Sequence, residues 1–107
     1  MDTWTLRTLV YVRGEKLKES DLVRKISEYL KTIPNLFFWK EHGGIYGTAG
    51  IPDIIVCYKG RFIAFECKVG NNKPTVLQDV TIKQILKAGG TAVVVRTVDE
   101  VRKIISA

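Results

Sequence analysis

The sequence predicts a single α/β domain in which a small sheet is flanked by helices. Segments with apolar residues at helical spacing alternate along the chain with short runs of β-branched and aromatic residues. The 107 residues are enough for one modest hydrophobic core and too few for two. A composition of 46% apolar and 26% charged residues is typical of a globular protein, so we treat residues 1–107 as one domain.

The first half of the chain predicts two strands and a helix. Residues 3–12 are rich in Thr, Val, Trp and Tyr, which favours a strand. Residues 19–32 carry apolar side chains at helical spacing, and Pro34 ends that helix. Residues 35–40, NLFFWK, indicate a short strand, and the Gly-rich segment 41–52 is predicted to be a loop.

A β-hairpin is predicted next. Two apolar runs, 53–58 and 61–69, are joined by Lys59-Gly60, which suits a two-residue turn. Such a turn pairs Tyr58 with Arg61, and this pairing fixes the register of both strands.

A helix, a strand and a final helix follow the hairpin. The Lys-Pro-Thr at 73–75 starts a helix that runs to about Ala88 and ends at Gly89-Gly90. The β-branched run at 91–97 is of the kind that is buried on both faces of a sheet. A capping box at 97–100 opens a short C-terminal helix.

Charge and cysteine content narrow the functional classes. The 17 Lys and Arg residues exceed the 11 Asp and Glu residues by six, which suggests a polyanionic partner such as nucleic acid. No apolar run approaches the roughly 20 residues of a membrane span, and the N-terminus lacks a signal-peptide pattern. Cys57 and Cys67 should point to opposite faces of the sheet and have no zinc-type spacing. We therefore expect a disulfide-free, cytoplasmic protein.

Three charged residues lie inside the hairpin strands, where burial costs free energy unless the charges are paired. The predicted register places Asp53 directly opposite Glu66, and Lys68 points to the same side. Two facing carboxylates repel each other unless a cation lies between them, and oxygen ligands suit Mg²⁺ or Mn²⁺. With a lysine to orient or deprotonate a water, these groups could hydrolyse a phosphodiester. The alternative is an ion pair between Lys68 and an acid on a solvated sheet face.

The order of these motifs resembles a known nuclease family. Pro52-Asp53, a hairpin and Glu66-Cys67-Lys68 form the PD-(D/E)XK signature of the restriction-endonuclease-like superfamily. The acidic helix, aromatic strand, Gly-rich loop, early helical Gln78 and Gly-Gly pair before a Val-rich strand are similar to its virus-type replication-repair nuclease branch, VRR-NUC. The match covers about 19–101 and leaves 1–18 as an N-terminal extension.

The resemblance implies a restriction-endonuclease-like fold, with a mixed sheet and an αβββαβ core. It also implies a Mg²⁺- or Mn²⁺-dependent endonuclease that cuts branched DNA, such as Holliday junctions or flaps, during replication, repair or recombination. Members that consist of this domain alone are expected to form homodimers. A non-catalytic DNA-binding module with the same fold is the alternative, although Asp53, Glu66 and Lys68 are all present.

The resemblance also assigns roles at the centre of the site. Asp53 matches the central metal ligand, Glu66 matches the second carboxylate and Lys68 matches the catalytic lysine. Cys67 would contribute at most its backbone carbonyl to the metal.

A helical acid is expected to complete the metal ligands. At about 100° per residue, Glu19 falls within the apolar stripe of its helix, where an acid is out of place unless it reaches the site. Glu15 is the second candidate. If Ser20 is instead the N-cap, Glu19 lies outside the helix as a solvent-exposed charge.

The remaining predicted site residues have weaker support. Gln78 matches a glutamine that the family places beside the site, but it also fits a capping box with Thr75. Several residues in or near the Gly-rich loop, and one lysine before the second helix, are predicted to contact DNA. These residues, each of which also fits an ordinary surface position, are Lys40, His42, Tyr46, Thr48 and Lys73.

Overall fold

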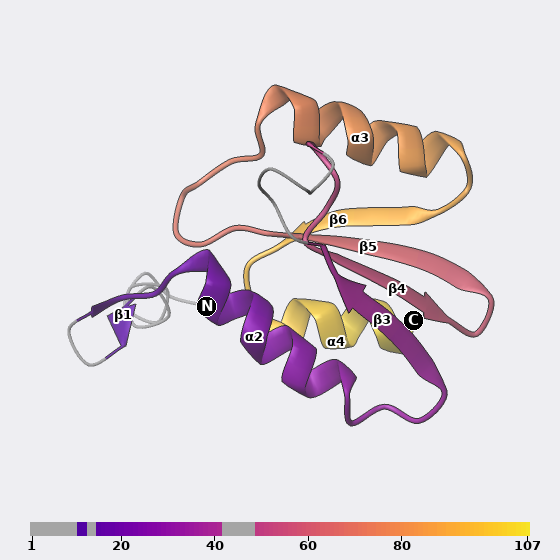
Figure 1. Ribbon diagram of the computed structural model, residues 1–107, viewed down its shortest axis with the longest axis horizontal. Coiled ribbons are helices and arrows are strands. Elements are labelled where there is room, and N and C mark those ends of the chain that lie inside the picture. The colour runs from indigo at the N-terminus through magenta and orange to yellow at the C-terminus, as the bar shows by residue number, and fades with distance from the viewer. Residues whose placement is uncertain (1–10, 13–14, 42–48) are drawn as a thin grey trace.

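A four-stranded mixed sheet forms the centre of the computed structural model, which describes residues 11–12, 15–41 and 49–107 (Figure 1). The strands lie in the order β3, β4, β5 and β6. Strand β4 is antiparallel to both of its neighbours, β3 and β5, and β6 runs parallel to β5. Their bounds are Leu36–Lys40 for β3, Ile54–Tyr58 for β4, Arg61–Cys67 for β5 and Thr91–Val95 for β6.

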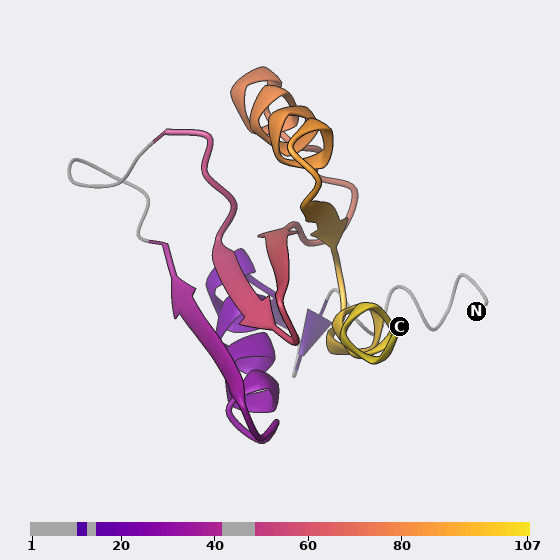
Figure 2. The same cartoon turned by 90° about the vertical axis from the view of Figure 1, so that its right-hand side faces the viewer.

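Three helices cover the two faces of this sheet (Figure 2). Helices α2 (Glu19–Leu30) and α4 (Val98–Ser106) pack on one face, and α3 (Val76–Lys87) lies over the other. A separate ribbon pairs β1 (Tyr11–Val12) with β2 (Glu15–Lys16). The order α2, β3, β4, β5, α3, β6 confirms the predicted αβββαβ core. Most of the predicted strand at 3–12 lies outside the described residues.

The main hydrophobic core lies between the sheet and helices α2 and α4. The helical spacing of Leu22, Ile26 and Leu30 turns these side chains toward the sheet, and each is at most 2% exposed. Sheet and α4 residues complete this core, among them Ile54, Val56, Ile63, Phe65, Val95, Val101 and Ile105. This face is therefore closed to solvent.

The face under α3 is less completely covered. A smaller buried cluster contains Ile55, Ala64, Ile82 and Ala92. Beside it, a groove of about 520 Å³ runs between α3 and the sheet. The aromatic side chains of Phe37, Trp39 and Phe62 remain 64%, 45% and 46% exposed on this side.

The hairpin register is the predicted one. Lys59 and Gly60 both have positive φ, 51° and 75°, as a type I′ turn requires. Tyr58 pairs with Arg61, and the ladder continues to the Ile54–Phe65 pair. The alternating pleat carries this register to the next position, where Asp53 and Glu66 lie.

The helix ends follow local sequence signals with one difference. At α3, the Thr75 hydroxyl accepts the Gln78 N–H at 3.2 Å, and Gln78 Oε1 accepts the Thr75 N–H at 2.8 Å. At α4, the Thr97 hydroxyl accepts the Glu100 N–H, but the Glu100 carboxylate accepts the Arg96 N–H instead of the Thr97 N–H. The second capping box is therefore only half as predicted.

The other global predictions concern membranes and cysteines. Among the described residues, no helix has the length and apolar character needed to cross a bilayer. Cys57 is exposed, whereas Cys67 is buried in the core under α2 and α4. The two thiols are free and lie on opposite faces, as the register predicted.

Candidate active site

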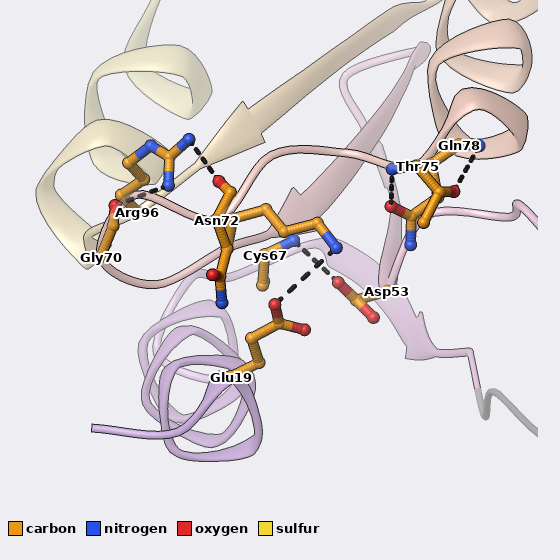
Figure 3. A network of polar contacts seen from close by, with 9 residues as sticks. Glu19, Asp53, Cys67, Gly70, Asn72, Thr75, Gln78 and Arg96 are labelled. Carbon is orange, nitrogen blue, oxygen red and sulfur yellow. Dashed lines mark hydrogen bonds and ion pairs between the residues drawn. The ribbon is translucent and has the colours of Figure 1, made fainter. Parts of the chain in front are cut away.

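Near the open end of the β4–β5 hairpin, Asp53 and Cys67 lie beside Glu19 of α2 (Figure 3). Asp53 directly precedes β4, and its Oδ2 accepts the Cys67 N–H from β5 at 2.7 Å. The Asp53 carbonyl accepts the Glu41 N–H at 2.8 Å, which extends the β3–β4 ladder. Asp53 is thus fixed through its side chain on one side and through its backbone on the other.

Glu66 is the most unusual residue of the site. Its side chain is 1% exposed, and neither carboxylate oxygen has a hydrogen-bond partner among the described residues. Burial, and after it the nearby Asp53 carboxylate, raise the pKa of Glu66 to about 8. A buried carboxylate in this position must be either protonated or balanced by a cation. Glu66 therefore fits a metal ligand.

Lys68 lies two residues beyond Glu66 and is only 7% exposed. Its Nζ lies 3.7 Å from Glu19 Oε1, at the start of α2. The side chain is thus buried and directed toward an acid, which contradicts a solvated sheet face at this end of the hairpin. The contact joins the second strand of the hairpin to the helix that precedes the sheet.

The Cys67 side chain points away from this cluster into the core. Burial, and then the charges of Asp53 and Glu66, raise the pKa of the Cys67 thiol far above its usual range. The thiol therefore stays protonated and is unsuited to bind a metal. The backbone of Cys67 is the part that contacts the site, because its N–H binds Asp53.

Glu19 is the first residue of α2, and Lys18 is the N-cap. The alternative of an N-cap at Ser20 is therefore wrong. Asp21 Oδ2 accepts the Lys18 N–H at 3.1 Å, and this contact sets the helix start two residues earlier. Glu15, the second candidate, lies in β2, and its side chain is outside the described part of the structure.

A cleft of about 340 Å³ opens beside Asp53. Lys40, one of the predicted DNA-contacting residues, is exposed at the end of β3 and lines this cleft. Among the lining residues that sequence reasoning did not place at the site are Ser20 and Arg24, both on α2. Their four-residue spacing on one helix face was a usable signal. The cleft thus combines acidic and basic side chains.

The structure places some of the other predicted site residues and does not describe the rest. Gln78 makes the capping contact with Thr75 through its side-chain oxygen, which is one of its two predicted roles. Lys73 is exposed in the connection that leads to α3. His42, Tyr46 and Thr48 lie outside the described residues.

The described acidic side chains do not by themselves form a complete metal site. Among the described side chains, no group of three His, Cys, Asp or Glu residues is close enough to hold an ion. Glu19 is instead directed toward Lys68. A cation between Asp53 and Glu66 would need other oxygen ligands, such as a backbone carbonyl, water or phosphate.

Among the solved structures that share this fold, two are described as VRR_NUC domains. A "VRR_NUC domain protein" aligns with a TM-score of 0.68 and 24% sequence identity, over 84% of this chain and 86% of the other. A structure described as "VRR_NUC domain" aligns with a TM-score of 0.65 and 25% identity, over 84% of this chain and 97% of the other. No protein-family model and no curated protein matches the sequence. The similarity is therefore carried by the three-dimensional structure.

Proposed function

This chain has the fold of a VRR-NUC nuclease domain, and we propose that it is a divalent-metal-dependent endonuclease that hydrolyses phosphodiester bonds in branched DNA. The observation that carries this proposal is the Glu66 carboxylate, which is buried, unpaired among the described residues and adjacent to Asp53. A purely structural domain gains nothing from such a group, because a well-packed apolar side chain would be more stable there.

Asp53 and Glu66 would hold the ion, with the Cys67 carbonyl and water or phosphate oxygens as further ligands. Glu19, which faces Lys68 in this structure, would have to turn toward the ion to become a ligand. Bound Mg²⁺ or Mn²⁺ would polarise the phosphodiester and make water a stronger nucleophile. Glu66 would release its proton to solvent when the cation binds, so that the buried carboxylate is then balanced by the cation instead of by the proton. Asp53 is already oriented for this role by the Cys67 N–H.

Lys68 would act as the catalytic lysine. Its Nζ would orient the attacking water or balance the negative charge that develops on the phosphate. The contact with Glu19 at 3.7 Å and the burial of the side chain limit the positions of this ammonium group. Gln78 would lie beside the reacting groups while it caps α3.

The substrate would be a Holliday junction or a flap, in replication, repair or recombination. The excess of basic residues supports binding to a phosphate backbone, with discrimination by DNA shape. Lys40 lines the cleft beside Asp53 and would contact that backbone, as would Lys73. The loop residues His42, Tyr46 and Thr48 are proposed to extend the same surface. Such a substrate agrees with the cytoplasmic location expected from the sequence.

A homodimer would place two such sites on one branched substrate. The exposed aromatic side chains of Phe37, Trp39 and Phe62 support this proposal, because they offer an apolar surface to a second copy. Light scattering should give the mass of two chains, and Trp39→Glu should reduce it to that of one. A wild-type mass of one chain would contradict the dimer.

Cleavage of labelled DNA tests the main proposal. Wild-type protein with Mg²⁺ or Mn²⁺ should cut a four-way junction or a flap in preference to linear duplex, and EDTA should stop the reaction. Asp53→Asn should abolish cutting, whereas Asp79→Asn should retain it, because Asp79 is an exposed partner of Lys83. Equal DNA binding by wild type and Asp53→Asn, without cutting by either, would favour the non-catalytic binding module.

A further inference from the structure

A single arginine outside the predicted site holds the segment that follows Lys68. Arg96 comes directly after β6, and its guanidinium points into the turn between β5 and α3 (Figure 3). Nη1 donates to the Gly70 carbonyl at 2.9 Å, and Nη2 donates to the Asn72 carbonyl at 2.8 Å. We infer that Arg96 is a positioning residue that fixes the backbone carrying the Lys68 ammonium group. This inference rests on the function proposed for the site.

Apart from Arg96, the turn is anchored by the side chain of Val69, which is 5% exposed in the main hydrophobic core. Strand β5 ends at Cys67, and the Lys68 N–H donates to the Val95 carbonyl at 3.1 Å. The Asn72 N–H then closes the turn on the Val69 carbonyl at 3.1 Å, with Gly70 at a φ of +58°. Beyond Val69 the turn pairs with no strand among the described residues, and the guanidinium binds two of its carbonyls instead.

The turn connects two residues or elements of the proposed site, so its position affects both of them. Lys68 precedes it, and Thr75, the N-cap of α3, follows three residues after Asn72. The capping contact between Thr75 and Gln78 fixes the first turn of that helix. Arg96 thus holds a connector with a proposed catalytic residue at each end.

Arginine is suited to this task by its shape. Its planar guanidinium carries several donors in a fixed arrangement, so that two carbonyls can be bound at once. The backbone of Arg96 is itself held, because its N–H donates to Glu100 Oε1 at 3.2 Å. The clamp is therefore preorganised before any substrate binds.

The chain contains a matched control for the loss of such a clamp. Arg61 also binds two backbone carbonyls, those of Ile104 at 3.4 Å and Ile105 at 2.8 Å. These contacts join the start of β5 to the end of α4, at the opposite end of the hairpin from Lys68. A change at Arg61 removes the same kind of interaction without altering the turn after Lys68.

The first experiment measures the exposure of Lys68 without relying on activity. Folded wild type, Arg96→Gln and Arg61→Gln are treated briefly with an amine-acylating reagent, and the labelling of each lysine is followed by peptide mass spectrometry. Arg96→Gln should raise the Lys68 rate by about fivefold or more through local opening, and Arg61→Gln should change it by less than about twofold. Equal rates in the two variants would overturn the inference.

The second experiment measures cleavage. At saturating branched DNA, the single-turnover rate of Arg96→Gln should fall by about ten- to a hundredfold, with DNA affinity within about twofold of wild type. Arg61→Gln should keep the wild-type rate at temperatures where both variants are folded. Equal losses in the two variants would mean that Arg96 acts only through stability, which overturns the inference.

Two further outcomes remain decisive. If wild type cuts no DNA, the proposed function fails, and the Lys68 labelling alone decides whether Arg96 holds that residue. If Arg96→Gln does not fold, Arg96→Lys replaces it, because lysine keeps the charge and can still reach one carbonyl. Arg96→Lys should show a smaller increase in Lys68 labelling and a smaller decrease in cleavage rate than expected for Arg96→Gln. Wild-type values in both assays would overturn the inference.

Discussion

The two ends of the β4–β5 hairpin are built on opposite physical principles. At the turn end, Lys59 and Gly60 adopt the dihedral angles that their turn requires, and Arg61 binds two backbone carbonyls of α4. At the open end, Glu66 is buried without a hydrogen-bond partner among the described residues. The contacts at the turn end stabilise the fold, whereas the open end keeps the Glu66 carboxylate buried at a cost in stability, as suits a reactive site. Both depend on the same register.

The largest expected effect is a loss of catalytic activity when Lys68, at the open end of the hairpin, is replaced. Lys68→Met should lower branched-DNA cleavage by about 10²- to 10⁴-fold, because it removes the ammonium group that is proposed to orient the attacking water or balance the charge on the phosphate. Single-turnover rates measured with the folded variant test this expectation. Lys83→Met is the control, since Lys83 is 74% exposed and pairs with Asp79 on the surface of α3. Comparable rates for the two variants would remove Lys68 from the mechanism.

A second prediction concerns stability of the metal-free protein. The pKa of Glu66 is raised to about 8 in the folded state from an ordinary value of 4.5, so the folded state binds more protons between these two pH values. Its contribution to stability is therefore complete below pH 4.5 and declines as the pH rises toward 8. Glu66→Gln should remove this decline. At pH 8 its free energy of unfolding should exceed that of wild type by about 1–3 kcal/mol, so that it unfolds at a higher urea concentration.

Urea titrations in EDTA at several pH values provide the measurement. Glu28→Gln is the control, because Glu28 lies on the surface of α2 with Arg24 and should leave the pH profile unchanged. A wild-type stability that stays constant between pH 5 and 8 would mean that Glu66 is not buried as an isolated acid.

The smallest expected effect lies at the turn end. Gly60→Ala should cost about 1 kcal/mol, because the φ of +75° is unfavourable for alanine even though its Cβ would meet no atom within 4 Å. Gly60→Asn should cost less, since asparagine tolerates positive φ. Thermal unfolding measures both changes, and cleavage by the folded variants should equal that of wild type. A loss of cleavage greater than the loss of folded protein would mean that the two ends are coupled.

Much of the fold could be predicted from local sequence patterns. The helical spacing from Leu22 to Leu30 predicted α2 to within two residues at its C-terminal end. Lys59-Gly60 fixed the hairpin register, and this register placed Asp53 opposite Glu66. The Thr75–Gln78 capping box was likewise visible, because its two partners lie three residues apart. Such signals suffice because each depends on neighbours in the sequence.

The sequence by itself therefore determined the helices and strands of the αβββαβ core, the hairpin register and the identity of the facing carboxylates, but not the β1–β2 ribbon. Tertiary structure decided the burial of Glu66, the contact between Glu19 and Lys68 and the groove left open beside α3. It also decided that Arg96 reaches back 26 residues to Gly70. Periodicity and turn chemistry are local, whereas burial and long-range hydrogen bonds depend on how the elements pack.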